Sequence, residues 1–183
     1  MEYILASGSP RRKELLKFVI PEFEIITADT EETCPNEVTV KQRPQYLALK
    51  KAKAVAKNHK DATVIGADTA VFLGENMLGK PKSTDDAKNM LKSLSGKTHS
   101  VITGCAIVNG AKEKSFSVET KVKFLELDDN EIDDYIKTNE PFDKAGGYGI
   151  QGFGALLIES ITGDYFNVVG LPVSKLNIYL KEF

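Results

Sequence analysis

Two arginines and a run of small residues stand close together in the segment Ser7-Gly8-Ser9-Pro10-Arg11-Arg12. An apolar strand precedes this segment and a helix follows it, so the turn presents the free N–H groups of a helix N-terminus. Cations are disfavoured at that end of a helix, which suggests that Arg11 and Arg12 serve a bound anion. The pattern predicts a site for a polyanion such as a phosphate chain. Two solvated arginines on a surface helix are the simpler alternative.

Acidic residues in two other segments could work on such an anion. Asp68 follows the apolar run Val64-Ile65-Gly66-Ala67, which predicts a buried strand. Ligands of open α/β sheets gather beyond the carboxyl ends of strands, where an acid can bind a divalent cation or act as a general base. A turn aspartate that accepts backbone N–H groups is an equal alternative. Glu31 and Glu32 lie in an acidic loop, and one of them can share a cation with Asp68 unless the loop is merely solvated.

Lysines and a glycine-rich segment complete the candidate residues. Lys80 lies between a glycine and a proline, which fix the backbone and aim the side chain, whereas Lys51 belongs to a lysine-rich helix where most lysines only aid solubility. Segment 140–152 is rich in glycine, which permits close approach of the backbone to a ligand. Gln151 in this segment can both donate and accept hydrogen bonds, which suits the edge of a base. A flexible glycine-rich loop is the alternative.

Alternating strand and helix signals must position these residues. Ser9 suits an N-cap whose hydroxyl accepts a backbone N–H, and Pro10 suits the first helical position. Asn109-Gly110 predicts a hairpin, and Asp128 with Glu131 resembles a capping box. Parallel and antiparallel signals together predict an α/β fold with a mixed sheet. Strands are expected near 3–6, 23–26, 64–73, 100–108, 114–124, 156–159 and 166–169. Helices are expected from 10, near 42–58, 83–94 and 128–138, and from 172, with a loop at 139–154.

The composition bounds the class of protein. The chain has 183 residues, 42% hydrophobic and 27% charged, with a formal net charge of −2. These values predict one globular domain over residues 1–183, either an ordinary domain or two small lobes around one core, and they argue against a broad nucleic-acid-binding surface. No apolar run approaches the roughly 18 residues of a membrane span, and the N-terminus lacks a secretory pattern. Cys34 and Cys105 are isolated thiols, so we expect a cytoplasmic protein without a membrane partner.

Several of these motifs together resemble one family. Their order along nearly the whole chain is similar to that of the Maf family of nucleoside triphosphate pyrophosphatases. The resemblance implies a two-lobed fold on a long mixed β-sheet with flanking helices and a central cleft, similar to inosine-triphosphate pyrophosphatases. It also implies hydrolysis of a nucleoside triphosphate to the monophosphate and pyrophosphate with Mg²⁺ or Mn²⁺, in the house-cleaning of nucleotide pools, and a homodimer. The motifs are residues 7–12, Gly66-Ala67-Asp68-Thr69, Lys80-Pro81, Leu94-Ser95-Gly96, Asp143-Lys144-Ala145-Gly146, Gly149-Ile150-Gln151-Gly152 and Val169-Gly170-Leu171-Pro172.

The resemblance also implies roles for individual residues. Asp68 matches the proton acceptor, and Asp68 with Glu32 matches the acids that hold the metal. Neighbouring acids and lysines leave open the choice between Glu31 and Glu32 and between Lys51 and the lysines beside it. Substrate-binding positions are matched by Ser7, Arg11, Arg12, Lys51 and Lys80, and positions linked to base selectivity by Arg11, Thr69 and Gln151.

Thr69 directly after Asp68 resembles the subfamily that acts on dTTP and UTP, with modified pyrimidine nucleotides as further candidate substrates. Two alternatives remain. One is the sister activity on 7-methyl-GTP, whose enzymes usually carry a different residue after the acid. The other is a nucleotide-binding regulator of cell division or septum formation, which could dispense with the acid at position 68.

Overall fold

The computed structural model of the protein describes residues 2–183. The chain forms two compact units. The first unit contains residues up to Thr69 together with Thr103–Val118 and Phe166–Phe183, and the second contains Ala70–Ile102 and Glu119–Tyr165. The strands form a seven-stranded sheet with the order β2-β1-β3-β5-β6-β7, and β4 pairs with β3. Parallel and antiparallel pairs both occur, which confirms the predicted mixed sheet.

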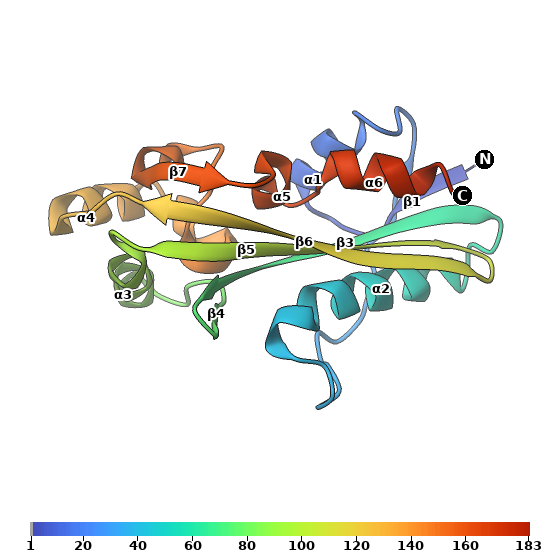
Figure 1. The fold of residues 1–183 in the computed structure, drawn as a ribbon, viewed down its shortest axis with the longest axis horizontal. Helices are drawn as coiled ribbons and strands as arrows, with labels where there is room; N and C mark the ends of the chain where they lie inside the picture. Colours follow the sequence, from blue (N-terminus) through green and yellow to red (C-terminus); the bar gives the residue numbers. More distant parts are fainter. Residues whose placement is uncertain (1) are drawn as a thin grey trace. The chain divides into compact units, whose positions relative to one another are not determined.

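The first unit places helices on both sides of its strands. Figure 1 shows α2 on one side and α1 and α6 on the other. Strand β1 pairs in parallel with β2 and with β3. The elements are β1 (Glu2–Leu5), α1 (Pro10–Leu16), β2 (Glu24–Ile25), a 3₁₀ turn (Val40–Gln42), α2 (Arg43–Ala56), α5 (Tyr165–Val169), α6 (Val173–Leu180), and parts of β3 (Ala62–Leu73), β5 (Thr98–Asn109) and β6 (Lys112–Phe124).

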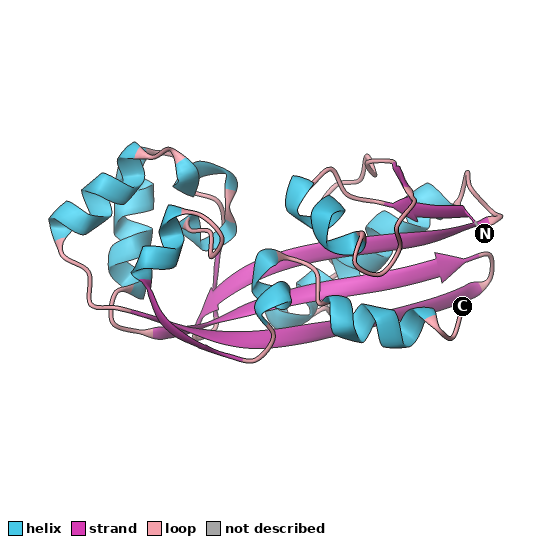
Figure 2. Ribbon diagram, turned by 90° about the horizontal axis from the view of Figure 1, so that it is seen from above, coloured by secondary structure: helices cyan, strands magenta, loops and turns pink. Residues whose placement is uncertain are grey.

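The second unit holds the remaining parts of β3, β5 and β6. Helices α3 and α4 contact each other, and Figure 2 shows the helices of this unit grouped together. The capping box predicted at Asp128 and Glu131 forms in full, while Ser83 caps α3 by accepting the N–H of Asp86. The other elements are β4 (Asn76–Leu78), α3 (Thr84–Leu94), α4 (Asp129–Lys137), β7 (Ile158–Thr162) and 3₁₀ helices at Glu140–Asp143, Ala145–Gly147 and Phe153–Leu157.

Three local predictions from the sequence are wrong. Residues 166–169 belong to helix α5 and not to a strand, because a run of four residues with three apolar side chains is too short to show its period. Segment 139–154 is not an open loop, since it contains 3₁₀ helices. Ser9 occupies the N-cap position of α1, but its hydroxyl makes no capping hydrogen bond. Of the two predicted start signals of this helix, only Pro10 at its first position is therefore confirmed. Among residues 2–183, no helix is long and apolar enough to cross a membrane.

Helix α2 lies directly against the sheet because two strand positions lack a side chain. A Cβ atom on Gly66 of β3 would overlap the carbonyl oxygen of Ala48, and one on Gly104 of β5 would overlap the backbone of Pro44 and Gln45. Only glycine permits such contact between backbones. Small and branched residues fill the rest of this layer, namely Ile4, Ala6, Ala48, Ala52, Val55, Ala62, Val64, Ala106 and Val108.

We expect Gly104→Ala to lower the free energy of unfolding by about 1–3 kcal/mol, because the added methyl group overpacks the contact between α2 and β5. Gly79→Ala is the control, since no described atom lies within 4 Å of a Cβ at Gly79. Urea unfolding of both variants measures the difference. Equal stability of the two variants would contradict this account of how α2 is seated.

His99 is a buried polar residue of the second unit. Its Nε2 atom lies 2.7 Å from the hydroxyl oxygen of Tyr148, and its ring packs edge-on against Phe124 and Tyr148. Its Nδ1 atom is buried without a hydrogen-bond partner among the described residues. Burial therefore lowers the pKa of His99 from 6.5 to about 4.

This pKa makes stability depend on pH. The unfolded chain binds a proton at His99 near pH 6.5, and the folded protein binds it only near pH 4. As the pH falls through this window, the unfolded state binds more protons, so the free energy of unfolding should fall by up to ~3 kcal/mol. We expect His99→Phe to remove this part of the pH dependence. The measurement is urea unfolding of the parent and of His99→Phe from pH 7.5 to pH 4. Parallel pH profiles of the two proteins would refute the assignment of this pH dependence to His99.

Candidate active site

Asp68 lies in the middle of β3 and not at its carboxyl end, which corrects the placement expected from the sequence. The strand that ends here is the neighbouring β1, whose last pair joins Leu5 to Ile65. Ala6 donates a final backbone hydrogen bond to Ile65 at 2.8 Å, and the chain then leaves the sheet through Ser7. Asp68 is therefore beyond the carboxyl end of β1, so the strand-end rule holds for the neighbouring strand.

Lys51 of α2 forms salt bridges with two carboxylates. Its Nζ atom lies 2.7 Å from Oδ1 of Asp68 and 2.8 Å from Oε1 of Glu32. The side chains of Lys51 and Asp68 are only 16% and 15% exposed, whereas that of Glu32 is 65% exposed. Lys53 instead pairs with Glu113. Of the residues that the sequence left open, Lys51 and Glu32 are therefore the ones that join Asp68.

The loop that carries Glu32 is tied to α2 by two other cations. Lys50 donates from Nζ to the carbonyl oxygen of Glu31 at 2.8 Å and to that of Thr33 at 3.3 Å. Arg43 donates to the carbonyl oxygen of Glu32 at 3.3 Å. Lys50 and Arg43 thus bind the backbone of the loop, while Lys51 binds the side chain of Glu32. No sequence pattern predicted this role of Arg43.

The acid and the ammonium change each other's proton affinity. Burial raises the pKa of Asp68, and the charges of Lys51 and Arg12 oppose this rise without cancelling it. Burial lowers the pKa of Lys51, but Asp68 and Glu32 outweigh that effect, so the pKa of Lys51 is raised. Lys51 therefore stays an ammonium at neutral pH, and Asp68 has the increased basicity that suits a general base.

Arg12 forms a second cluster in the same unit. Its Nε donates to the carbonyl oxygen of Gly170 at 2.9 Å, Nη1 to Oγ of Ser7 at 3.0 Å, and Nη2 to Oγ1 of Thr69 at 3.0 Å. Burial lowers the pKa of Arg12, but a guanidinium stays charged in proteins. Successive strand residues point to opposite faces, so β3 presents Asp68 to one cluster and Thr69 to the other.

The structure brings together most of the residues singled out in the sequence. Ser7, Arg12 and Thr69 form one cluster, and Glu32, Lys51 and Asp68 form the other. Arg11 is the neighbour of Arg12 in the first turn of α1 and is partly exposed. Lys80 and Gln151 belong to the second unit, where both are exposed, so their part in the site stays a prediction.

Gln151 lies in a segment that one carboxylate holds in place. Oε2 of Glu140 accepts the N–H of Phe153 at 2.8 Å, and Oε1 accepts the N–H of Gly154 at 3.1 Å. The hydroxyl of Tyr135 donates to the same Oε1 at 3.0 Å. Glu140, at the start of the glycine-rich segment, thus holds the backbone directly after Gln151 in place, which a flexible loop would not show.

Two further residues escaped the sequence analysis. Thr103 of β5 is fully buried, and its Oγ1 lies 2.9 Å from Oγ1 of Thr69. Asn167 of α5 is also fully buried and binds Thr103 through both its backbone and its side chain. The available signal was a threonine inside an apolar strand, because a buried polar group needs a partner.

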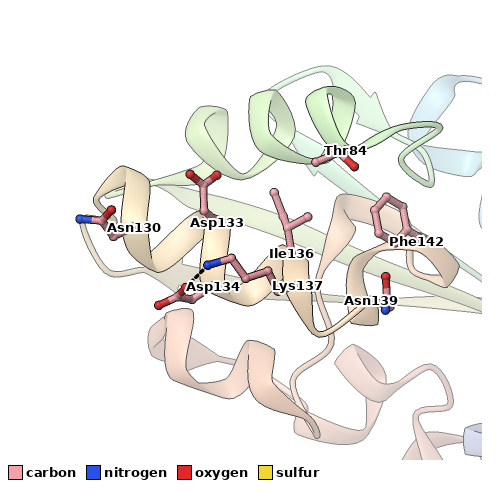
Figure 3. A pocket seen from close by; sticks show the side chains of 8 residues that line it. All are labelled: Thr84, Asn130, Asp133, Asp134, Ile136, Lys137, Asn139 and Phe142. Carbon is pink, nitrogen blue, oxygen red and sulfur yellow. Dashed lines mark hydrogen bonds and ion pairs between the residues drawn. The ribbon is translucent and has the colours of Figure 1, made fainter.

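A separate pocket of about 440 Å³ lies in the second unit (Figure 3). Its charged residues are already matched within that unit. Lys137 pairs with Asp134 at 2.7 Å, as the dashed line in Figure 3 marks, and Asp133 pairs with Lys88 at 2.6 Å. The pocket is lined by none of the candidate site residues.

Asp68 and Glu32 are the two acids of this site that could hold a hard divalent cation. Both carboxylates contact the same ammonium, so their oxygens converge on one region that favours positive charge. Mg²⁺ prefers oxygen ligands and is commonly held by one or two carboxylates plus substrate phosphates. Residues 2–183 contain no group of three or more His, Cys, Asp or Glu side chains placed to hold a metal. A cation here would therefore take two ligands from this chain and the rest from phosphate and water.

Comparison with known proteins relates the whole described chain to one family. The family model for Maf-like proteins matches residues 2–183. A Bacillus cereus protein named dTTP/UTP pyrophosphatase is 51% identical over 180 residues, which cover 98% of this chain and 94% of the relative. A Clostridioides difficile (strain 630) protein of the same name is 50% identical over 185 residues, which cover 100% of this chain and 95% of the relative.

Solved structures share the fold. A HAM1 protein from Coxiella burnetii matches with a TM-score of 0.60 at 15% identity, over 100% of both chains. The Staphylococcus aureus Ham1 protein matches with a TM-score of 0.50 at 20% identity, over 69% of this chain and 73% of that one. At these identities the likeness concerns the arrangement of helices and strands, and it confirms the expected fold class.

Proposed function

The chain belongs to the Maf family, and we propose that it is a pyrophosphatase that hydrolyses dTTP and UTP to the nucleoside monophosphate and pyrophosphate. The observation that carries the proposal is the contact of Lys51 with both Asp68 and Glu32, since it places a buried acid, a second acid and a fixed cation at one point. Relatives that are half identical over nearly their whole length carry this activity in their names.

Asp68 supplies the base in this proposal. Its carboxylate orients a water molecule and takes a proton from it while the water oxygen attacks the α-phosphorus. The bond from the α-phosphorus to the bridging oxygen breaks, and pyrophosphate leaves with the electron pair. Burial makes Asp68 more basic than an ordinary carboxylate, which favours the proton transfer. No covalent nucleophile is needed, because positioning and charge stabilisation can carry phosphoryl chemistry.

The cations stabilise the charge that moves onto the leaving pyrophosphate. Arg12 and Lys51 are held in place by the contacts described above, and Arg11 lies next to Arg12. Fixed charges need no reorganisation during the reaction and are therefore effective. We propose that Asp68 and Glu32 hold Mg²⁺ or Mn²⁺, which would neutralise phosphate charge and polarise a phosphoryl oxygen when bound.

The remaining assignments rest on motifs alone. We propose Lys80 for phosphate binding and Arg11, Thr69 and Gln151 for base selectivity. A cytoplasmic location, a homodimer and a role in nucleotide pool sanitation are likewise proposals. Modified pyrimidine nucleotides are further candidate substrates. Activity on 7-methyl-GTP and regulation of cell division or septum formation are the alternatives, and Asp68, paired and in place, disfavours a regulator without catalysis.

The function is tested by pyrophosphate release from dTTP, UTP, pseudouridine triphosphate and 7-methyl-GTP, each with Mg²⁺, with Mn²⁺ and with a chelator. We expect metal-dependent release that favours the pyrimidine nucleotides. A preference for 7-methyl-GTP would overturn the substrate assignment and keep the reaction. Binding of these nucleotides without any release of pyrophosphate would favour the regulator.

We expect Asp68→Asn to lower the turnover number about 100-fold or more, because the amide cannot accept the proton of the attacking water. Asp61→Asn is the matched control, since Asp61 is an exposed acid immediately before the same strand. Steady-state pyrophosphate release at saturating dTTP and metal measures both variants. Near-normal turnover of a folded Asp68→Asn protein would remove Asp68 from its role as base.

A further inference from the structure

A series of hydrogen bonds leads from the partly buried Arg12 into the protein interior. Nη2 of Arg12 donates to Oγ1 of Thr69 at 3.0 Å, and Oγ1 of Thr69 lies 2.9 Å from Oγ1 of Thr103. Oγ1 of Thr103 donates to the carbonyl oxygen of Asn167 at 2.8 Å. Thr103 and Asn167 are fully buried. These hydrogen bonds thus connect Arg12 to β3, β5 and α5.

The last acceptor in this series of hydrogen bonds determines which atom donates in each of them. A carbonyl oxygen can only accept, so the hydroxyl proton of Thr103 goes to Asn167. Thr69 must then donate its own hydroxyl proton to Thr103, which leaves the oxygen of Thr69 as the acceptor for Arg12. Each hydroxyl donates once and accepts once, and all members point the same way. The side-chain oxygen of Asn167 also accepts the N–H of Thr103 at 3.2 Å, which locks the last link.

Arg12 gains a single orientation from these contacts. A guanidinium has five N–H donors in a rigid fork, and three of them bind Gly170, Ser7 and Thr69. Among the described residues, no acceptor binds the second N–H on Nη1 or the second N–H on Nη2. Two such donors from one fork match two oxygens of a phosphate. Without the support of Thr69, the guanidinium would be held by Gly170 and Ser7 alone, and the direction of its Nη2 group would be less well defined.

We propose that Thr103, anchored by Asn167, is a positioning residue that acts through Thr69 to aim Arg12 at the triphosphate. The substrate in this statement rests on the proposed function, but the aiming of Arg12 does not. Thr103 makes no contribution to the chemistry itself. The oxygen of the Thr103 hydroxyl accepts the proton of Thr69, which keeps a lone pair of Thr69 directed at Arg12. A side chain without that hydroxyl would let Thr69 turn away.

Thr63 offers a matched control in the same unit. It is a fully buried threonine of β3, and its Oγ1 accepts a hydrogen bond from Nδ2 of Asn109 at 2.7 Å. Thr63→Val and Thr103→Val therefore remove the same hydroxyl from equally buried strand positions. Only Thr103→Val breaks the series of hydrogen bonds to Arg12. A general loss of stability would therefore appear in both variants, whereas a change in the orientation of Arg12 would appear only in Thr103→Val.

The orientation of Arg12 is observed directly by ¹⁵N–¹H NMR of its Nε–H group, identified by its loss in Arg12→Lys. We expect Thr103→Val to shift this signal and speed its exchange with water, while Thr103→Ser and Thr63→Val leave it as in the parent. An unchanged signal in Thr103→Val, or an equal change in Thr63→Val, would overturn the proposal whatever the substrate is.

Binding of the α,β-imido analogue of dTTP, measured by calorimetry, supplies the second readout. We expect Thr103→Val to weaken binding about fivefold to tenfold, the usual effect of one lost hydrogen bond, and Thr103→Ser to restore it. In an Arg12→Met background, Thr103→Val should cause no further weakening, whereas independent effects would overturn the proposal. If the parent neither binds the analogue nor releases pyrophosphate, the proposed function fails, and the NMR result still decides the role of Thr103.

Discussion

The candidate site depends on how closely α2 approaches the sheet. Gly66 and Gly104 bring the backbone of the helix into contact with the backbones of β3 and β5, where any larger residue would hold it away. Lys51 extends from this seated helix, and its ammonium reaches Asp68, which shares a face of β3 with Gly66. The salt bridge between Lys51 and Asp68 thus depends on glycine at positions 66 and 104. Desolvation of this pair costs free energy, and the second acid at Glu32 helps to offset it.

Strand β3 then organises both clusters. Asp68 and Thr69 are neighbours in the chain and point to opposite faces, so one strand carries the acid cluster on the α2 side and the Arg12 cluster on the other. The early end of β1 at Leu5 leaves this stretch of β3 without its parallel neighbour and lets Ser7 and Arg12 approach. The charge of Arg12 acts on the pKa of Asp68, so the two clusters are electrostatically linked.

Local rules predicted much of this arrangement. Pro10, the Asn109-Gly110 hairpin, the cap at Asp128 and the mixed sheet follow from short-range chemistry, and the structure confirms them. The motifs also pointed to the members of both clusters. Pairings of distant residues could not be predicted, because Thr103 and Asn167 meet across 64 positions of the chain. The place of Asp68 within β3 was missed for a related reason, since it depends on where the partner strand ends.

The two acids that flank Lys51 are held by different means. Asp68 belongs to a strand within the sheet, whereas Glu32 belongs to a loop that has no helix or strand of its own and is tied to α2 by side chains. Local opening of such a loop breaks a few partly solvated contacts, while opening of β3 would require the sheet to unfold. The sheet therefore fixes the position of Asp68, whereas the position of Glu32 depends on the contacts that Arg43, Lys50 and Lys51 make with its loop.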